Sequence, residues 1–417
     1  MKKTALFLLI IYSFLSGTLR AQSPDDLQNI LGQISTDSVY ATVQDLQNFG
    51  SRLAVRNENN PDGNRDVADY IVRRLENYGI STSIDSFDLH GGVIYGMWIN
   101  QWFYNVKGVL PTDNPIDDSI ILVGAHMDAI AFNNGSYSSV AAQVPGADDN
   151  ASGVAVMLEL ARIIHENNLQ FRRDIHFMAF DMEELGLVGS GHDAQKRSEA
   201  GEKIALMMNN DMVSYQPDNN WRLLLRWYDN AVDVLNRATA ICEQYTNMVP
   251  LTLPDSENVE RAQRSDSYAY YQYGYRATYA SEYSFSTSYH TINDVTDSCN
   301  YPYLAEVARY NMAMLTAYAD PTSGVGIEKY PAATTSTYAY PNPSSGKVIL
   351  QYQLEQDSPV SISVLDMRGC IVLLSDQSVQ SAGICHSELD LSSLPAGLYL
   401  CQIRTDKGIE MLKLLRQ

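Results

Sequence analysis

The sequence predicts an α/β fold, with a mostly parallel or mixed sheet covered by helices on both faces, followed by a small all-β sandwich. Short apolar runs alternate with helix-like stretches between residues 119 and 318, as they do in parallel sheets joined by crossover helices. Residues 340–417 instead alternate apolar and polar side chains, with glycines at the turns, as antiparallel strands do. The intervening stretch is rich in Pro, Thr, Ser and Ala, which is the composition of a linker.

The first predicted elements are helices that cover one face of the sheet. Residues 24–48 carry apolar side chains at helical spacing, and residues 64–78 form a clearer amphipathic pattern that ends at Gly79. Residues 93–110 then alternate apolar and polar side chains around Gly and Asn, which predicts strands near an edge of the sheet.

The central part of the chain predicts the parallel strands and their crossover helices. Continuous apolar runs of this length indicate strands that are buried on both faces. Residues 268–289 are dense in tyrosine, which fits either packing beneath a polar-tipped surface or the lining of a substrate cleft. The strands are expected at 120–123, 175–180 and 204–208, and the helices at 153–165, 229–245 and 303–318.

The N-terminus has the features of a secretory signal. Lys2 and Lys3 precede an apolar run at 5–15, and Ala21 is a small residue suited to cleavage. That run is too short to span a bilayer comfortably, and no later stretch offers about 18 uninterrupted apolar residues. We therefore expect an exported mature chain without a transmembrane helix. The expected parts are a signal peptide at 1–21, an α/β domain at 22–319, a linker at 320–338 and a β-sandwich at 339–417.

Composition limits the classes of partner. The formal net charge is −20, which argues against nucleic acid as a partner, because nucleic-acid binding needs basic patches. The five cysteines are too few for a disulfide scaffold and lack the close spacing of a zinc finger. A Cys242–Cys299 bridge and small buried thiols are both compatible with the sequence.

A set of acidic residues and one histidine follows the predicted strands, where open α/β sheets bind their ligands. Zinc takes nitrogen from His and oxygen from carboxylates, and a catalytic site leaves one position open for water. Each residue alone has an ordinary explanation, because Asp caps helices and forms turns. Together they favour a metal centre. The residues are His126, Asp128, Asp148, Asp149, Glu183, Glu184 and Asp211.

The spacing within this set suggests separate roles. Asp128 lies two residues after His126, where a carboxylate can accept the second imidazole proton and fix the tautomer. Adjacent carboxylates repel, so the Glu183–Glu184 pair favours a nearby cation. One Glu then binds metal while its neighbour takes a proton from a metal-activated water. Among the seven histidines, His290 is the best further candidate, because it lies in a loop before a predicted helix.

These residues resemble those of the co-catalytic zinc aminopeptidases, typified by secreted bacterial leucyl aminopeptidases, over roughly residues 22–318. The family has a zinc-exopeptidase fold of the phosphorylase/hydrolase-like class. One departure is Ser265-Asp266-Ser267, where the family commonly has Ser-Asp-His; it affects the expected specificity pocket and none of the direct ligands. The matching motifs are Gly-Ala-His126-Met-Asp128, Pro-Gly-Ala-Asp-Asp149-Asn-Ala-Ser-Gly, Glu183-Glu184-x-Gly-Leu-x-Gly-Ser, Asn-Asn-Asp211-Met, Ser265-Asp266 and His290-Thr-x-x-Asp.

The resemblance implies a centre of two Zn²⁺ ions, with Asp149 as the bridging ligand and a cis peptide bond between Asp149 and Asn150. Glu183 would be the general base, and Asp128 would orient a histidine ligand. The remaining ligands would be His126 and Asp211 at one ion, and Glu184 and His290 at the other.

The function that the resemblance implies is a secreted zinc-dependent aminopeptidase, which removes residues from peptides that have a free N-terminus. Glutaminyl-peptide cyclotransferases share this fold but keep a single zinc, on the equivalents of Asp149, Glu184 and His290. The intact pair of His126 and Asp211 favours two metals. A non-catalytic binding ectodomain is a third alternative, but such a protein is expected to have lost ligands or the base, and this chain has lost none.

The last segment resembles a different family, the C-terminal sorting domain of the type IX secretion system. The resemblance implies that residues 339–417 engage this machinery for export through the periplasm, with release or attachment at the cell surface. A sandwich that binds carbohydrate or protein is the alternative, and the segment has no aromatic platform for it. The matching motifs are Tyr340-Pro-Asn-Pro-Ser-Ser-Gly346, Val-Leu-Asp366-Met-Arg-Gly369 and Leu-Ser-Ser-Leu-Pro-Ala-Gly397-Leu-Tyr399.

Overall fold

The computed structural model describes residues 24–54, 63–94, 97–133, 136–137, 143–253, 255–323, 337–366, 371–374, 378–405 and 408–417. The expected signal peptide at 1–21, Cys370 and most of the expected linker lie outside these residues. Within the described part of the chain, no helix is long and apolar enough to cross a membrane.

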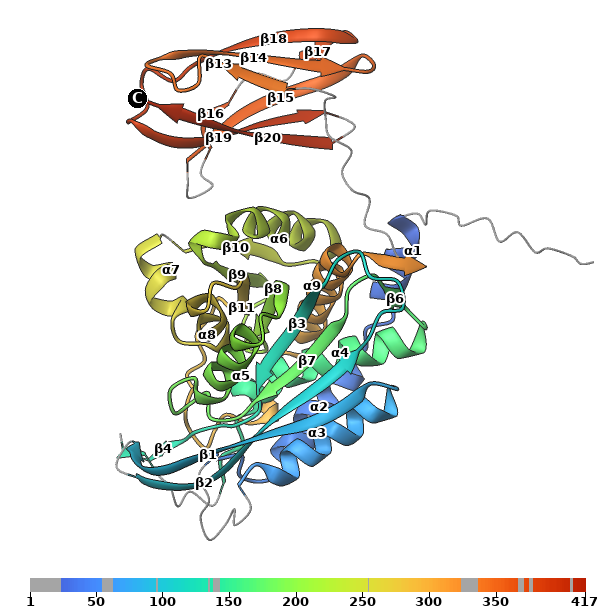
Figure 1. Cartoon of the computed structure of the whole chain (residues 1–417), viewed down its shortest axis with the longest axis vertical. Coiled ribbons are helices and arrows are strands. Elements are labelled where there is room, and N and C mark those ends of the chain that lie inside the picture. Colours follow the sequence, from blue (N-terminus) through green and yellow to red (C-terminus); the bar gives the residue numbers. More distant parts are fainter. Residues whose placement is uncertain are drawn as a thin grey trace, which may run out of the picture.

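An eight-stranded sheet forms the centre of the first part of the chain (Figure 1). Its strands are β1 (Ser81–Ile94), β2 (Met97–Leu110), β3 (Ser119–His126), β7 (Ile175–Phe180), β8 (Lys203–Asn210), β9 (Arg222–Trp227), β10 (Val249–Leu251) and β11 (Ala277–Glu282). Their order across the sheet is β1-β2-β7-β3-β8-β11-β9-β10. The central strands β7, β3, β8 and β11 are parallel to one another, whereas the pairs β1–β2, β2–β7 and β11–β9 are antiparallel. The sheet is therefore mixed, as predicted.

Helices pack on both faces of this sheet. Alternate residues of β3 enter two separate cores: Ile121 and Val123 lie in one, and Ile120 and Leu122 in the other. This explains why the strand is a continuous apolar run in the sequence. The first core includes residues of α1 (Pro24–Leu31), α2 (Thr36–Gln47), α3 (Arg65–Asn77), α4 (Ser152–Glu166), α6 (Val232–Tyr245) and α9 (Tyr301–Ala319). The second includes residues of α5 (Val188–Glu199), α7 (Asp255–Ala262) and α8 (Asp266–Gln272).

Short elements complete this part of the chain. Strands β4 (Phe132–Asn133) and β5 (Ser136–Tyr137) pair with each other, and β6 (Gln170–Phe171) pairs with β12 (Pro321–Ser323). Three helical turns, η1 (Ala147–Ala151), η2 (Asp229–Ala231) and η3 (Thr296–Ser298), precede α4, α6 and α9.

Most of the strongly patterned elements were predicted to within a few residues. The strand expected at 175–180 is β7, and the helices expected at 64–78 and 303–318 are α3 and α9. The helical spacing at 24–48 belongs to two helices, because the Ser35 side chain accepts the N–H of Ser38 and thereby begins α2. Six further elements were not predicted from the sequence: β9, β10, β11, α5, α7 and α8.

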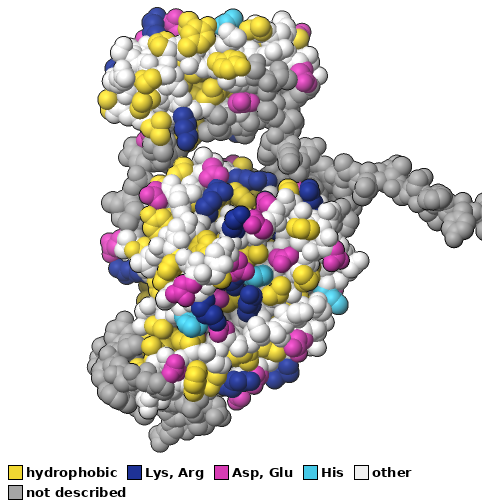
Figure 2. Space-filling model, in the orientation of Figure 1, with side chains coloured by type: hydrophobic (Ala, Val, Ile, Leu, Met, Phe, Trp, Pro, Cys, Tyr) yellow, Lys and Arg dark blue, Asp and Glu magenta, His cyan; other side chains and the backbone are white. Residues whose placement is uncertain are grey.

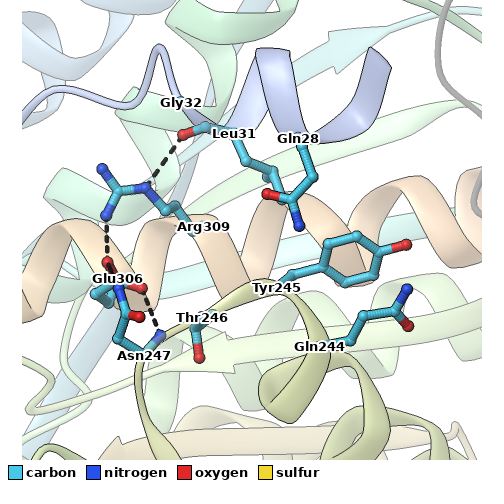
Figure 3. A pocket seen from close by; sticks show the side chains of 9 residues that line it. All are labelled: Gln28, Leu31, Gly32, Gln244, Tyr245, Thr246, Asn247, Glu306 and Arg309. Atoms are coloured by element: carbon cyan, nitrogen blue, oxygen red, sulfur yellow. Dashed lines mark hydrogen bonds and ion pairs between the residues drawn. The ribbon is translucent and has the colours of Figure 1, made fainter. Parts of the chain in front are cut away.

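A polar pocket of about 410 Å³ lies between α1, α6 and α9 (Figure 3). Arg309 of α9 donates to the Leu31 carbonyl at 3.2 Å and contacts the Glu306 carboxylate at 2.5 Å. Glu306 also accepts the backbone N–H of Asn247 at 3.0 Å. Because the two charges neutralise each other, this arrangement is a structural contact that holds α1 and α6 against α9.

Residues 337–417 form the predicted all-β sandwich, with a core of its own. Val348, Leu350 and Tyr352 pack against Val360 and Ile362 in a cluster that contains only residues of this segment. One sheet consists of β13 (Thr337–Tyr340), β14 (Lys347–Leu354) and β18 (Gly383–Asp390). The other contains β15 (Ser358–Leu365), β16 (Ile371–Leu374), β19 (Gly397–Thr405) and β20 (Gly408–Arg416), with β17 (Ser378–Gln380) paired to β15.

Both ends of the linker expected at 320–338 belong to strands. Residues 321–323 form β12, which pairs with β6 of the α/β domain, and β13 begins at Thr337. The intervening residues 324–336 lie outside the described part of the chain. Composition alone does not reveal these two strands, because strand pairing with a distant segment leaves no local signal.

The Cys242–Cys299 bridge that the sequence allowed is absent, since both residues are free thiols. Cys242 packs in the core and contacts the Thr246 hydroxyl at 3.5 Å, so it behaves as a small buried residue. Cys385 and Cys401 are also free and buried.

On one face of the molecule, charged side chains of both signs are interspersed (Figure 2). On the face shown in Figure 2, Lys and Arg side chains lie among Asp and Glu side chains, with no extended area of one sign. The net charge of −20 is therefore not gathered into one patch on this face.

Candidate metal centre

The candidate residues converge at the carboxyl ends of three neighbouring parallel strands. His126 is the last residue of β3, and Asp211 directly follows β8. The pair Glu183 and Glu184 follows β7 after a two-residue turn. Because β7, β3 and β8 are adjacent in the sheet, their ends bring these side chains together.

Asp149 lies between two clusters of ligand atoms. Its Oδ1 is 3.3 Å from His126 Nε2, which is also 3.4 Å from Asp211 Oδ1. Its Oδ2 is 3.1 Å from His290 Nε2, which is also 2.8 Å from Glu184 Oε2. The aspartate thus presents one oxygen to each cluster, in the arrangement that a bridging ligand requires.

The donor set fits zinc. Two overlapping groups, His126–Asp149–Asp211 and Asp149–Glu184–His290, each place one ligand atom per residue within 4.8 Å of the others. The buried Oε1 of Glu184 has no hydrogen-bond partner. Imidazole nitrogen and carboxylate oxygen are ligands that zinc accepts. The ligand atoms of a third group, His126–Glu183–Glu184, also lie within 4.8 Å of one another. The assignment of Glu183 as the general base rather than as a ligand therefore remains a prediction.

Asp128 holds both sides of the centre in place. Its Oδ1 accepts the backbone N–H of Glu183 at 3.1 Å, and its Oδ2 accepts that of Glu184 at 3.3 Å. Nδ1 of His126 lies 3.1 Å from the backbone carbonyl oxygen of Asp128 and 3.4 Å from its Oδ1. One fully buried residue therefore orients a candidate ligand and the turn that carries both glutamates.

The turn that carries Asp149 is fixed from several directions. The peptide bond between Asp149 and Asn150 is cis, as the family resemblance implied. The Asp294 carboxylate accepts the backbone N–H of Asp149 at 3.0 Å, and the Asn150 side chain donates to the carbonyl of Asn210 at 2.9 Å. Gly146 precedes the turn with φ 51°, and a Cβ there would lie 2.4 Å from the Asp149 carbonyl oxygen.

Arg52 supports the same turn and was not identified from the sequence. Its fully buried guanidinium donates to the Gly146 carbonyl at 2.6 Å and also contacts the Pro145 carbonyl, while its Nε donates to Met127 at 3.0 Å. Burial lowers the pKa of Arg52 to about 10, and nearby carboxylates, Asp294 foremost, oppose this. The positive charge compensates part of the negative charge of the centre.

Asp148 faces away from the candidate ligands. Its Oδ1 accepts both the backbone N–H and the hydroxyl of Ser214, at 2.9 and 2.7 Å. The two adjacent aspartates therefore differ in what they contact: Asp148 holds the turn after β8, and Asp149 faces the two histidines.

The electrostatics of the centre favour a bound cation. Burial strongly raises the pKa of Glu183, with His126 opposing this, and burial together with Asp149 raises the pKa of Glu184 to about 7. Burial lowers the pKa of His290, but Glu184 and Asp149 outweigh it and raise that pKa to about 10. The raised pKa values mean that Glu183, Glu184 and His290 tend to hold protons, which offset the negative charge of the carboxylates. Bound metal ions would replace those protons.

An aromatic loop adjoins the centre. The Tyr289 ring stacks on His290 with ring centroids 3.6 Å apart, and Phe285 meets Tyr289 edge-on at 4.7 Å. Phe285 is 60% exposed and Tyr283 is 44% exposed, although both are large apolar residues. Part of the tyrosine-dense stretch therefore lines an open surface beside the candidate ligands.

Comparison with known proteins agrees with this geometry. The model of peptidase family M28 matches residues 105–315, about half of the chain. The chain belongs to peptidase family M28. The M28 match includes every candidate ligand, together with Asp128 and Glu183. A second model, that of a secretion system C-terminal sorting domain, matches residues 338–416.

Individual M28 relatives are distant. A probable zinc metalloprotease of Pyrenophora teres f. teres is 34% identical over 207 residues, which cover 47% of this chain and 42% of that protein. The chain spans about half the length, or less, of the curated relatives that it matches.

Two solved structures show the same fold. LapA aminopeptidase of Legionella pneumophila has a TM-score of 0.58 at 23% identity, covering 73% of this chain and 77% of that one. Glutaminyl cyclase of Bacteroides thetaiotaomicron has a TM-score of 0.53 at 19% identity, covering 68% and 97%. Because the fold is shared by both activities, it does not choose between them.

Proposed function

We propose that this chain is a zinc-dependent aminopeptidase that uses two Zn²⁺ ions. The observation that carries the proposal is the position of Asp149, whose two oxygens face two separate histidine–carboxylate clusters. The ligands at one ion are His126 and Asp211, and those at the other are Glu184 and His290, with Asp149 shared.

The division of labour follows from what each residue contacts. Bound zinc would polarise the scissile carbonyl and lower the pKa of the attacking water. Glu183, buried beside His126, takes the proton from that water and returns it to the leaving amine. Asp128 positions both glutamates and His126 through its hydrogen bonds and its contact with the imidazole.

The surroundings of the centre favour peptides with a free, apolar N-terminal residue. The buried carboxylates near the centre attract an α-ammonium group. The exposed rings of Phe285 and Tyr289 offer apolar surface next to His290, which suits a large apolar side chain.

The Glu183→Gln variant tests the mechanism. It keeps the size of the side chain and removes its basicity, so we expect unchanged zinc content and a loss in kcat of about 10²–10⁴-fold. The measurements are metal analysis of the purified protein and hydrolysis of an aminoacyl p-nitroanilide, with and without chelator. Glu184→Gln is the matched comparison and should lose zinc. Wild-type turnover by Glu183→Gln would sink the proposed role.

A single-zinc glutaminyl cyclase is the second candidate, because the Asp149–Glu184–His290 cluster alone suffices for it. The additional cluster of His126, Asp149 and Asp211 favours the aminopeptidase. Counting zinc decides between them: one ion per chain together with cyclisation of N-terminal glutamine would establish the cyclase.

We further propose that the chain has an N-terminal signal peptide at 1–21 and that residues 339–417 direct it to the type IX secretion machinery. The match to the sorting-domain family over 338–416 and the independent core of this sandwich support the proposal. The enzyme would then act outside the cell or at its surface.

A further inference from the structure

A groove of about 560 Å³ lies between α5 and α8, which pack against each other (Figure 1). Leu187, Gly191 and Gln195 line one side, and Tyr268, Gln272 and Tyr273 line the other. None of the candidate metal ligands lines it, so it is separate from the centre itself.

Both sides of this α5–α8 groove begin at the metal centre. Leu187 comes three residues after Glu184 and directly precedes α5. On the other side, α8 begins at Asp266, whose buried carboxylate interacts electrostatically with His126, and α8 packs against α5. The first turns of the two helices therefore meet beside the centre, and the groove leads away from it.

The lining has the chemistry of a peptide-binding surface. No charged side chain lines the groove, although the chain carries 78 charged residues, 29 basic and 49 acidic. Glutamine amides both donate and accept, as peptide groups do, and tyrosine rings pack against varied side chains. Gly191 keeps the floor open, because a Cβ there would meet no atom within 4 Å.

We propose that this groove binds the leaving-group side of the peptide substrate, from its second residue onward; the inference rests on the proposed aminopeptidase function. Glu183 returns the proton to the leaving amine, so the leaving segment starts beside Glu183, where the groove begins. From Leu187 to Gln195 the helix rises about 12 Å. That length accommodates three or four extended residues at about 3.3 Å each. The substrates are therefore oligopeptides of roughly four or five residues, rather than dipeptides alone.

The test compares Leu-Gly with Leu-Gly-Gly-Gly-Gly as substrates of the full, zinc-loaded chain. For the wild type we expect kcat/KM to be about tenfold higher for the pentapeptide, because the groove adds contacts equivalent to one or two hydrogen bonds. Gly191→Trp fills the groove from an open position, so within this variant the kcat/KM values for the two peptides should become equal. Ser198→Trp, an exposed site on the same helix outside the groove, is the matched control and should keep the gain.

A second variant protects the test against misfolding of Gly191→Trp. Gln272→Ala removes one exposed amide from the lining and should reduce the ratio of the pentapeptide kcat/KM to the dipeptide kcat/KM about threefold. Equal kcat/KM values for the two peptides in the wild type, or an intact length dependence in both variants, would overturn the proposal. If the wild type hydrolyses neither peptide, the proposed function itself has failed, which is a different result.

Discussion

Asp128 shows how a single buried side chain can organise two functional groups. Its carboxylate accepts the backbone N–H groups of Glu183 and Glu184 and lies 3.4 Å from His126 Nδ1. These contacts fix the turn after β7 relative to the end of β3. Such supporting contacts set ligand orientation, and their loss weakens metal binding even when every ligand is retained.

The Asp128→Asn variant tests this positioning role. The asparagine amide keeps one acceptor oxygen, but its NH₂ group replaces the oxygen that accepts the other glutamate N–H. Two donors then face each other, so one of the hydrogen bonds that hold the turn is lost. We expect zinc affinity or kcat/KM to fall by about 10–100-fold. Competition with a chelating dye measures the affinity. Asp85→Asn, at a partly exposed aspartate that contacts Lys196, is the control and should change neither quantity. An unchanged zinc affinity in Asp128→Asn would contradict the assignment.

At the scale of residues, the convergence of the candidate residues could be predicted because most of them lie at a strand end or at the start of a helix, in recognisable motifs. His126 ends β3 and Asp211 directly follows β8. Open α/β sheets bind their ligands at such strand ends, so an imidazole or carboxylate there indicates a binding site. Arg52 could not be predicted. Its partners are the carbonyls of Met127, Pro145 and Gly146, and a carbonyl acceptor leaves no trace in the sequence.

At the scale of elements, α5 packs closely on the sheet through one face and lines the α5–α8 groove with the other. A Cβ at Gly189 would lie 2.1 Å from the Asp181 carbonyl oxygen and 2.5 Å from Asn105 Oδ1. At Gly191, two residues on, it would meet nothing within 4 Å. This helix was not predicted because its glycines and serines suit close approach rather than helix propensity.

This pair of glycines gives a matched test of close packing. Gly189→Ala forces α5 away from β2 and β7, which should destabilise the protein by about 1–3 kcal/mol and lower activity by shifting Glu183. Gly191→Ala should be neutral or stabilise by about 0.5–1 kcal/mol, because alanine favours a helix without meeting a neighbour. Urea unfolding of both variants measures the difference. Equal stabilities would show that the backbone tolerates a side chain at Gly189.

At the scale of the whole molecule, the hydrophobic core of the sandwich shares no residue with the cores on the two faces of the α/β sheet, so the described chain has two units. Both units could be predicted from the sequence. Continuous apolar runs between helix-like stretches indicated the α/β unit, and apolar–polar alternation indicated the sandwich. Composition did not reveal strand β12, because Pro321 pairs with Phe171, 150 residues earlier in the chain. The Arg172 N–H groups reinforce this contact, since the backbone N–H donates to Asp320 at 2.9 Å and the guanidinium contacts the Asp320 carboxylate at 3.1 Å.

Two truncations locate the end of the catalytic unit. A chain ending at Ser323 keeps the β6–β12 pairing and the Asp320 contacts, so its Tm and kcat/KM should equal those of the full chain. A chain ending at Ala319 loses both, which we expect to cost about 1–2 kcal/mol and to lower Tm by about 2–8 °C. Thermal unfolding and peptide hydrolysis measure these effects on purified protein.

Both chains should fail to leave the cell, because they lack residues 339–417. Export of either chain would separate the sandwich from secretion, and loss of activity at Ser323 would show that the sandwich supports the catalytic unit.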